Sequence, residues 1–318
     1  MIKKLLVGAM MATAAMGAIA QEWPMAKPIK IIAVFPPGGS VDQVSRILAE
    51  ALRTELNQTV VVENIGGASG AIGTAAVAKA DPDGYTFGVV FDTHGVNQAL
   101  QPRMAFDTMK DLTHINLIGV APMVLASSKG SPIKTFKQLV DESKAKKPTS
   151  YGTIGAGSLG HLAMAQLAQR AGFDWNHVPY RGGGPLMNDA IGGHVPLAIG
   201  SLFLVKPHAD AGNVTPLVVT TTKRHPAMPN VPTIAESGFP GFEAPAYWGF
   251  IGPAKLPAPI VSRINTAITN VLKKPDVAKK LEEQGMEILA QGPAQFTAFT
   301  QRQMDTWGKF IKDNNITP

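Results

Sequence analysis

Residues 29–43, IKIIAVFPPGGSVDQ, contain the transition that decides the fold of this chain. The apolar run at 29–35 predicts a buried strand, and it ends in two prolines and two glycines. Apolar side chains then recur at helical spacing, at Val41, Val44, Ile47, Leu48, Ala51 and Leu52. A strand, a tight turn and a helix therefore follow one another, which is the first unit of an α/β fold.

The turn itself is suited to holding an anion. Gly38 and Gly39 have no side chains, so a ligand can approach the N–H groups at the start of the helix. Ser40 and Gln43 have the spacing of a capping box. The motifs G-x-x-x-x-G-K-[ST] and G-x-G-x-x-G are both missing here, which argues against a nucleotide. A carboxylate site and a capped turn without any ligand both stay open.

Strand-like and helix-like segments alternate along the rest of the chain, which predicts βαβ units and parallel pairing. Further strands are expected at 59–64, 85–91, 115–128, 149–155, 176–180, 195–201, 214–222 and 243–253. Helices are expected at 135–146, 159–172, 257–273, 275–284 and 293–314, and a glycine loop opens another helix within 66–80.

The length of 318 residues fits one large domain or two medium ones. No low-complexity linker divides the chain, so two domains would be joined through ordered elements. The two long strands, 115–128 and 243–253, are the natural crossing points. The expected division is a discontinuous first domain, 22–122 plus 249–318, and a second domain, 123–248.

The N-terminus has the form of a secretory signal peptide. Residues 1–20 combine Lys3 and Lys4, an apolar stretch and small residues before a cleavage site at Gln21. A membrane anchor is the alternative, but the apolar stretch is short for one. The sequence has no cysteine, which excludes disulfides, thiolate metal sites and a lipidated N-terminal cysteine. The mature chain is therefore expected to be a soluble periplasmic protein without a lipid anchor.

The charge balance points to small anions rather than to nucleic acid. The formal net charge is +6, and removal of Lys3 and Lys4 lowers it to +4. The remaining charge is mild and spread out, and a field of this kind favours small anionic ligands.

A second glycine loop, YGTIGAGSLGHLA at 151–163, repeats the order of strand, glycines, hydroxyl and helix. One such loop lies in each expected domain. Ligands in such sheets bind at the carboxyl ends of the strands, so the two loops are expected to face each other across a cleft.

The same segment permits an enzyme interpretation. AGSLG at 156–160 resembles the nucleophile elbow G-x-S-x-G, with Ala156 in the first glycine's place and Ser158 as nucleophile. His194, His208 and His225 follow, but none is near the C-terminus, and no H-G-G-G segment supplies an oxyanion hole. The histidines also lack H-E-x-x-H or paired spacing, so neither a metal site nor a cofactor is expected.

Six segments in order resemble the solute-binding receptors of tripartite tricarboxylate transporters, the Bug-type periplasmic proteins. They are FPPGGSVD (35–42), VVVENIGGASGAIG (60–73), DPDGYT (81–86), YGTIGAGSLGHLA (151–163), VPYRGGGP (178–185) and PNVPTIAESGFPG (229–241), and the resemblance spans essentially the whole mature chain. It implies a two-domain periplasmic-binding-protein fold of type II-like form, with mainly parallel sheets flanked by helices. The ligand, a small carboxylate, lies in the interdomain cleft.

The resemblance also implies the residues of the site. The first loop contributes Phe35, Pro36, Gly38, Gly39, Ser40 and Asp42, and the second contributes Thr153, Gly157, Ser158 and His161. Thr93, His94, Arg181, Ser201 and Tyr247 are further candidates around the cleft. A carboxylate beside an anionic ligand is repulsive, so Asp42 is expected to bond the loop or a water instead of the ligand.

Several positions depart from the pattern of the family. Ile65 stands where an arginine is frequent, and FDTH at 91–94, with Asp92 before Thr93 and His94, stands where S-x-T-H is frequent. Gly200 replaces an acid, which disfavours an amino-acid ligand because glycine cannot pair with an ammonium group.

Three candidates keep more than one interpretation. Arg181 pairs with a distal carboxylate or belongs to a surface turn. Tyr247 and Trp248 either form a wall for an aromatic ring or pack at the hinge, and packing is favoured for Trp248.

The sequence thus predicts a monomeric extracytoplasmic receptor for a di- or aromatic carboxylate. It would deliver this ligand to the permease subunits of the transporter in the membrane. The alternatives are a secreted serine hydrolase using Ser158 and a subunit that presents the ligand to a sensor.

Overall fold

The computed structural model describes residues 23–101, 103–145 and 149–316. The expected signal peptide at 1–20 lies outside these residues. Among the described helices, none is both long and apolar enough to cross a membrane.

The first elements follow the alternation that the sequence predicts. They are β1 (Ile29–Ala33), α2 (Ser40–Leu56), β2 (Val60–Asn64), η1 (Ala68–Gly70), α3 (Ala71–Ala78), β3 (Thr86–Val90), η2 (Asp92–Gly95) and α4 (Asn97–Leu100). β1 pairs in parallel with β2 and with β3, so these three strands form the βαβ arrangement expected from the sequence. The residues of β1 are almost fully buried, which fits a strand with helices on both faces.

The middle of the chain forms a second set of parallel strands. It contains α5 (Phe136–Lys144), β5 (Thr149–Thr153), α6 (Leu159–Ala171), β6 (Trp175–Pro179), α7 (Gly183–Gly192), β7 (Leu197–Ser201), α8 (Leu202–Asp210) and β8 (Val214–Val219). β5 pairs in parallel with both β6 and β7.

Two long strands connect the sets. β4 (Leu112–Ser128) pairs antiparallel with β9 (Pro245–Pro253) through residues 112–122 and with β7 and β8 through residues 123–128. β9 also pairs antiparallel with β3, so the strands form one continuous sheet in the order β2-β1-β3-β9-β4-β7-β5-β6. The predicted parallel pairing is therefore confirmed for β1–β3 and for β5–β7. At the centre of the sheet, β9 and β4 pair antiparallel with each other and with their neighbours.

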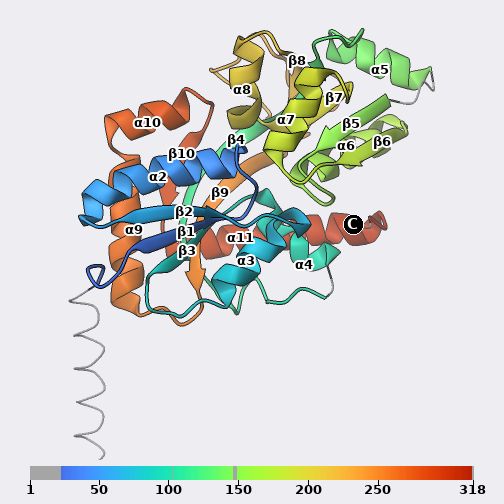
Figure 1. Cartoon of the computed structure of the whole chain (residues 1–318). Helices are drawn as coiled ribbons and strands as arrows, with labels where there is room; N and C mark the ends of the chain where they lie inside the picture. The colour runs from blue at the N-terminus through green and yellow to red at the C-terminus, as the bar shows by residue number, and fades with distance from the viewer. Residues whose placement is uncertain (1–22, 102, 146–148, 317–318) are drawn as a thin grey trace, which may run out of the picture.

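The C-terminal elements return to the first set. They are α9 (Ala258–Leu272), α10 (Pro275–Glu282), β10 (Glu287–Gln291) and α11 (Pro293–Asp313). We call β1–β3, β9, β10, residues 112–122 of β4 and their helices the β1 half, and the elements from residue 123 to β8 the β5 half. Figure 1 shows the two ends of the chain, blue and red, in the β1 half, and the green and yellow middle in the β5 half.

No strand was predicted from the sequence at the position of β10. Its sequence, EILAQ, is half exposed and lacks the apolar alternation of a strand, and Ala290 adopts a left-handed φ of 49°. Its pairing with β4 shifts register between Ile288 and Gln291. This strand exists because it adds to the edge of an existing sheet, which is a tertiary effect.

An aromatic cluster lies where the halves meet. Trp248 of β9 is fully buried between Phe91 of the β1 half and Phe203 of the β5 half, with ring centroids 5.0 and 5.6 Å away. The expected packing role of Trp248 is therefore confirmed. α11 packs through one apolar side, where Phe296, Trp307 and Ile311 are its buried apolar residues.

Candidate ligand-binding site

The first loop, residues 35–39, carries the chain from β1 into α2. Gly38 adopts a φ of 84°, a conformation that favours glycine, and Gly39 is the N-cap of α2. Ser40 is the first helical residue, and its side chain makes no capping hydrogen bond. The predicted capping box is therefore wrong, because the chain enters the helix one residue earlier than the box requires. Gln43 instead reaches the Gly38 carbonyl at 3.5 Å.

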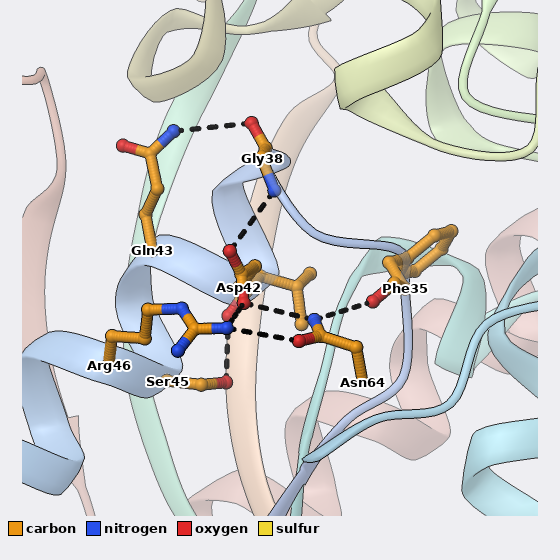
Figure 2. A network of polar contacts seen from close by, with 8 residues as sticks. Phe35, Gly38, Asp42, Gln43, Ser45, Arg46 and Asn64 are labelled. Atoms are coloured by element: carbon orange, nitrogen blue, oxygen red, sulfur yellow. Dashed lines mark hydrogen bonds and ion pairs between the residues drawn. The ribbon is translucent and has the colours of Figure 1, made fainter. Parts of the chain in front are cut away.

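Asp42 fastens this loop from inside the helix (Figure 2). One carboxylate oxygen accepts the Gly38 N–H at 3.0 Å, and the other accepts Asn64 Nδ2 at 3.0 Å and an Arg46 nitrogen at 2.9 Å. Asn64 Nδ2 also donates to the Phe35 carbonyl. Burial raises the pKa of Asp42, but the hydrogen bonds from Arg46, Gly38 and Asn64 outweigh it and keep that pKa below 3.8. The expectation that Asp42 bonds the loop is confirmed.

The second loop, residues 154–158, carries the chain from β5 into α6. Gly157 adopts a φ of 73°, and its N–H donates to His161 Nδ1 at 3.1 Å. Ser158 is the N-cap, and its Oγ accepts the His161 N–H at 3.4 Å. The His161 ring stacks on His177 with centroids 3.9 Å apart, and burial lowers the pKa of His161. These contacts give Ser158 and His161 a structural role in shaping the loop.

A third glycine segment meets the first loop. Gly183 and Gly184 begin α7, and they face Gly39 and Gly38 from the opposite half. A Cβ built on Gly39 would be 3.6 Å from the Gly183 nitrogen, and one built on Gly38 would be 3.8 Å from the Gly184 Cα. The missing side chains therefore let the two halves approach through their backbones.

An inner cavity lies behind this contact. Its lining comes from both halves: Phe35, Gly39, Ser40, Val41, Phe91, Ile154, Gly183, Ser201 and Leu204. Its volume of about 10 Å³ holds at most one water molecule, so the halves are closed over it.

Three helices begin at this cavity. The N-caps of α2 and α7 are Gly39 and Gly182, which have no side chain to cap with, and the N-cap of α8 is Ser201. The Ser201 hydroxyl is buried and has no hydrogen-bond partner among the described residues. Uncapped N–H groups and the positive ends of three helices thus point to an anion site.

An outer cleft of about 770 Å³ opens beside the inner cavity. The residues that line it are Phe35, Pro36, Pro37, Asn64, Gly66, Gly67, Ala68, Ser69, Ile72, Ile154, Gly155, Ala156, Pro179, Tyr180 and Arg181. Ser69 Oγ donates to the Ala156 carbonyl at 2.8 Å, which links the halves across the cleft. Arg181 lies on the wall of this cleft.

The structure brings only some of the candidate residues together. Phe35, Gly39, Ser40 and Ser201 line the inner cavity, and Phe35, Pro36 and Arg181 line the outer cleft. The other candidates line neither space and serve local structure or the core: Gly38, Asp42, Thr93, His94, Thr153, Gly157, Ser158, His161 and Tyr247. Ligand contact by these residues stays a prediction.

Two of them have clear partners elsewhere. His94 Nε2 lies 3.0 Å from His114 Nε2 beneath Phe296, and Thr153 Oγ1 lies 2.7 Å from His177 Nε2.

The sequence did not predict five of the residues that line the inner cavity: Val41, Phe91, Ile154, Gly183 and Leu204. Phe91 follows β3 as Phe35 follows β1, so the rule for carboxyl ends of strands would have found it. Gly183 was visible in the RGGGP segment. Leu204 carried no local signal, because only the packing of α8 brings it to the cavity.

The described residues contain no cluster of three or more histidine, aspartate or glutamate side chains that could hold a metal ion. Ser158 Oγ accepts from a backbone N–H, and the nearby His161 Nδ1 is occupied by the Gly157 amide. This hydrogen bonding does not form the serine–histidine pair of a nucleophile.

Comparison with known proteins gives a consistent result. A family model described as "Tripartite tricarboxylate transporter family receptor" matches residues 44–316. Protein BugT of Bordetella pertussis is 31% identical over 311 residues, which cover 96% of this chain and 95% of BugT.

Two solved structures from Rhodopseudomonas palustris are also similar. A protein with adipate has a TM-score of 0.89 and 31% identity, with 93% of this chain and 99% of that one covered. MatC with bound malate has a TM-score of 0.84 and 28% identity, with 90% and 99% covered. Such likenesses to periplasmic binding proteins confirm the fold expected from the sequence.

Proposed function

This chain belongs to the tripartite tricarboxylate transporter family of receptors, and we propose that it captures a small organic dicarboxylate and delivers it to a membrane permease. Receptors of this family bind solutes, and the two similar proteins above were solved with adipate and malate, which are both dicarboxylates. The proposal assigns the same class of ligand to this chain.

The convergence of helix N-termini on the inner cavity carries the proposal. Uncapped N–H groups of α2, α7 and α8 offer donors to an anion, and Ser201 adds a buried hydroxyl without a partner. Charge-assisted hydrogen bonds contribute about 1.5–3 kcal/mol each, so a few donors suffice for a small carboxylate. A backbone site of this kind fits a carboxylate without needing a cationic side chain.

Ligand entry requires the halves to separate, because the inner cavity holds at most one water molecule in the closed arrangement. The proposed domains are 22–122 plus 249–318, and 123–248. The change of pairing partners between Pro122 and Met123 of β4 supports this division. Bending of β4 and β9 would then open the outer cleft and admit the ligand.

The remaining features of the proposal follow from a receptor role. The signal peptide is removed before Gln21, the mature monomer is free in the periplasm, and no cofactor or turnover is involved. The backbone bond of Ser158 supports binding over the alternative of a serine hydrolase.

Calorimetry on the mature protein tests the binding site. A thermal-shift screen of mono-, di- and aromatic carboxylates would first identify a ligand, because binding raises apparent stability. Gly39→Val should then weaken binding by at least tenfold, since its branched side chain would cover the first N–H groups of α2 and contact Gly183. Gly130→Val is the matched control, because no atom lies within 4 Å of a Cβ at Gly130.

The ligand's methyl ester should not bind detectably. Equal affinity of wild type and Gly39→Val for the same carboxylate would place the site elsewhere. If no carboxylate binds, the proposed function fails.

A further inference from the structure

Asp92 is a buried carboxyl group that has no part in the proposed carboxylate site. It follows β3 and begins η2, and its relative exposure is 2%. Neither carboxylate oxygen has a hydrogen-bond partner of normal geometry within residues 23–101, 103–145 and 149–316, and no ion pair includes Asp92 there. Buried carboxylates without partners are costly, so an isolated one requires an explanation.

Among the described residues, no cationic side chain contributes to the pKa of Asp92. Burial raises the pKa of Asp92 to about 7, and the backbone amides of Leu159 and Thr93 lower it only in part. Tyr247 is the titratable group that faces Asp92 from β9; burial raises the pKa of Tyr247, and the charge of Asp92 raises it further. A proton or a donor from outside the protein is therefore needed to satisfy this carboxyl group near neutral pH.

Asp92 is the sequence neighbour of a residue of the inner cavity and lines neither cavity itself. The preceding residue, Phe91, lines the inner cavity. Leu159, whose amide faces Asp92, is the first residue of α6 in the β5 half. The carboxyl group therefore lies where the two halves close.

Three further polar groups near this junction are also unsatisfied among the described residues. They are Ser201 Oγ, Tyr247 Oη and Trp248 Nε1. Ser201 shares the inner cavity with Phe91, Trp248 packs on Phe91, and a Cβ at Gly95 of η2 would be 3.1 Å from the Tyr247 hydroxyl. Several unpartnered polar groups in one buried region indicate a ligand with polar groups of its own.

We propose that Asp92 selects carboxylates that also carry an N–H or O–H donor, by accepting a hydrogen bond from that donor while the ligand lies between the two halves. This inference rests on the proposed function and names the substrate class of the same site: amino- or hydroxy-substituted carboxylates. An unsubstituted diacid has no donor for Asp92, so the carboxyl group must stay protonated or meet the ligand with like charge. An ammonium or hydroxyl group beside the carboxylate satisfies the buried oxygen instead. Gly200 disfavours an amino-acid ligand because glycine cannot pair with an ammonium group. Asp92, which follows β3, supplies an acid that can pair with one.

Matched ligand sets test the inference by calorimetry. Succinate, malate and aspartate share a carbon skeleton and differ at one carbon by hydrogen, hydroxyl or ammonium, and adipate with its 2-hydroxy and 2-amino derivatives forms a longer set. Within the set that binds, a substituted member should bind wild type at least tenfold more tightly than the unsubstituted diacid. In Asp92→Ser this ratio should fall at least tenfold, with the affinity of the unsubstituted diacid unchanged or raised.

Ammonium and hydroxyl ligands should differ in the number of protons that binding releases. Near pH 7, an ammonium ligand should displace the proton of neutral Asp92 into solvent, leaving the carboxylate paired with the ammonium group. Calorimetry in two buffers of different ionisation enthalpy measures this release in wild type, and a hydroxyl ligand should release no proton. Asp92→Asn keeps the shape of the side chain and provides a second variant if Asp92→Ser does not fold.

A purely structural role for Asp92 would change the affinity of all members of a set equally. An unchanged ratio in both variants, or an unsubstituted diacid that binds wild type as tightly as its substituted forms, would overturn the inference. In either case carboxylate binding itself would still be observed, so the proposed function would stand.

Discussion

Gly184 of α7 lies so close to Pro37 of the first loop that a Cβ built on Gly184 would be 2.7 Å from the Pro37 carbonyl oxygen. Real Cβ atoms essentially never approach that closely, and a backbone oxygen cannot move aside as a flexible side chain can. The two residues belong to opposite halves of the molecule. Their contact therefore depends on closure and not on the folding of either half.

Gly184→Ala should accordingly favour the open arrangement. Overpacking of this kind costs about 1–3 kcal/mol, which would lower the closed population by about 5- to 150-fold. Small-angle scattering of the unliganded variant should give a larger radius of gyration than that of wild type. The control is Gly130→Ala, where a Cβ meets nothing within 4 Å. Superimposable scattering curves for Gly184→Ala and wild type would show that closure does not need this glycine.

Asp42→Asn should destabilise the first loop at neutral pH. Three donors, from Gly38, Asn64 and Arg46, converge on the carboxylate, and asparagine cannot accept them all. We expect a loss of about 1–3 kcal/mol in the free energy of unfolding, measured by urea denaturation near pH 7.

The pH dependence of that loss has a definite sign. The hydrogen bonds that hold the pKa of Asp42 below 3.8 in the fold contribute stability that is complete above this value and declines as pH falls through the folded pKa. The difference between wild type and Asp42→Asn should therefore stay constant above about pH 5 and shrink below about pH 4. A difference that does not change with pH would mean that the charge of Asp42 contributes nothing.

The His94–His114 pair should make the fold sensitive to mild acid. Burial lowers the pKa of His94 well below 6.5 and that of His114 to about 4, and the two rings share one hydrogen bond of 3.0 Å. Below about pH 6.5 the unfolded chain binds protons that the folded chain does not, so stability falls as the pH falls.

His114→Gln removes one of these groups. Between about pH 7 and pH 5, its free energy of unfolding should decline by about 1–2 kcal/mol less than that of wild type. Denaturant unfolding at both pH values measures the difference. Few carboxylates titrate in this range, so equal declines in the two proteins would refute a role for His114.

Ser40→Ala should cost less than about 0.5 kcal/mol, because its side chain does not cap α2. Thr135→Ala is the informative comparison, since Thr135 is the N-cap of α5 and accepts the Gln138 N–H at 3.1 Å. Loss of that cap should cost about 1 kcal/mol. Thermal unfolding of both variants measures the two losses of stability. A larger loss for Ser40→Ala than for Thr135→Ala would show that the Ser40 side chain caps α2.

Local patterns were sufficient for most of the elements. The apolar run at 29–35, the helical spacing after Ser40 and the long runs of β4 and β9 all formed the structures expected of them. The side chains of these segments indicate the structure directly, because burial on one or both faces of an element determines which of its positions are apolar. β10 has no such signal, and it forms only because the edge of β4 offers hydrogen bonds to it.

Some features of the candidate site could likewise be predicted from the sequence, and others could not. The glycines of both loops and the loop-bonding role of Asp42 followed from the sequence, since positive φ, helix starts and like-charge repulsion are local or pairwise properties. No sequence pattern indicated that Gly183 and Gly184 would lie against Gly39 and Gly38, or that His94 would contact His114. Those partners are separated along the chain, and only the pairing order of the strands brings them together.

The sequence by itself thus determined the alternation of strands and helices, the two anion-ready turns and the class of receptor. The tertiary structure alone decided that three uncapped helices begin at one closed cavity, and that Asp92 is buried without a hydrogen-bond partner of normal geometry among the described residues. The physical reason is that backbone propensity acts over a few residues. Burial and the absence of a partner depend instead on every element that packs around a group.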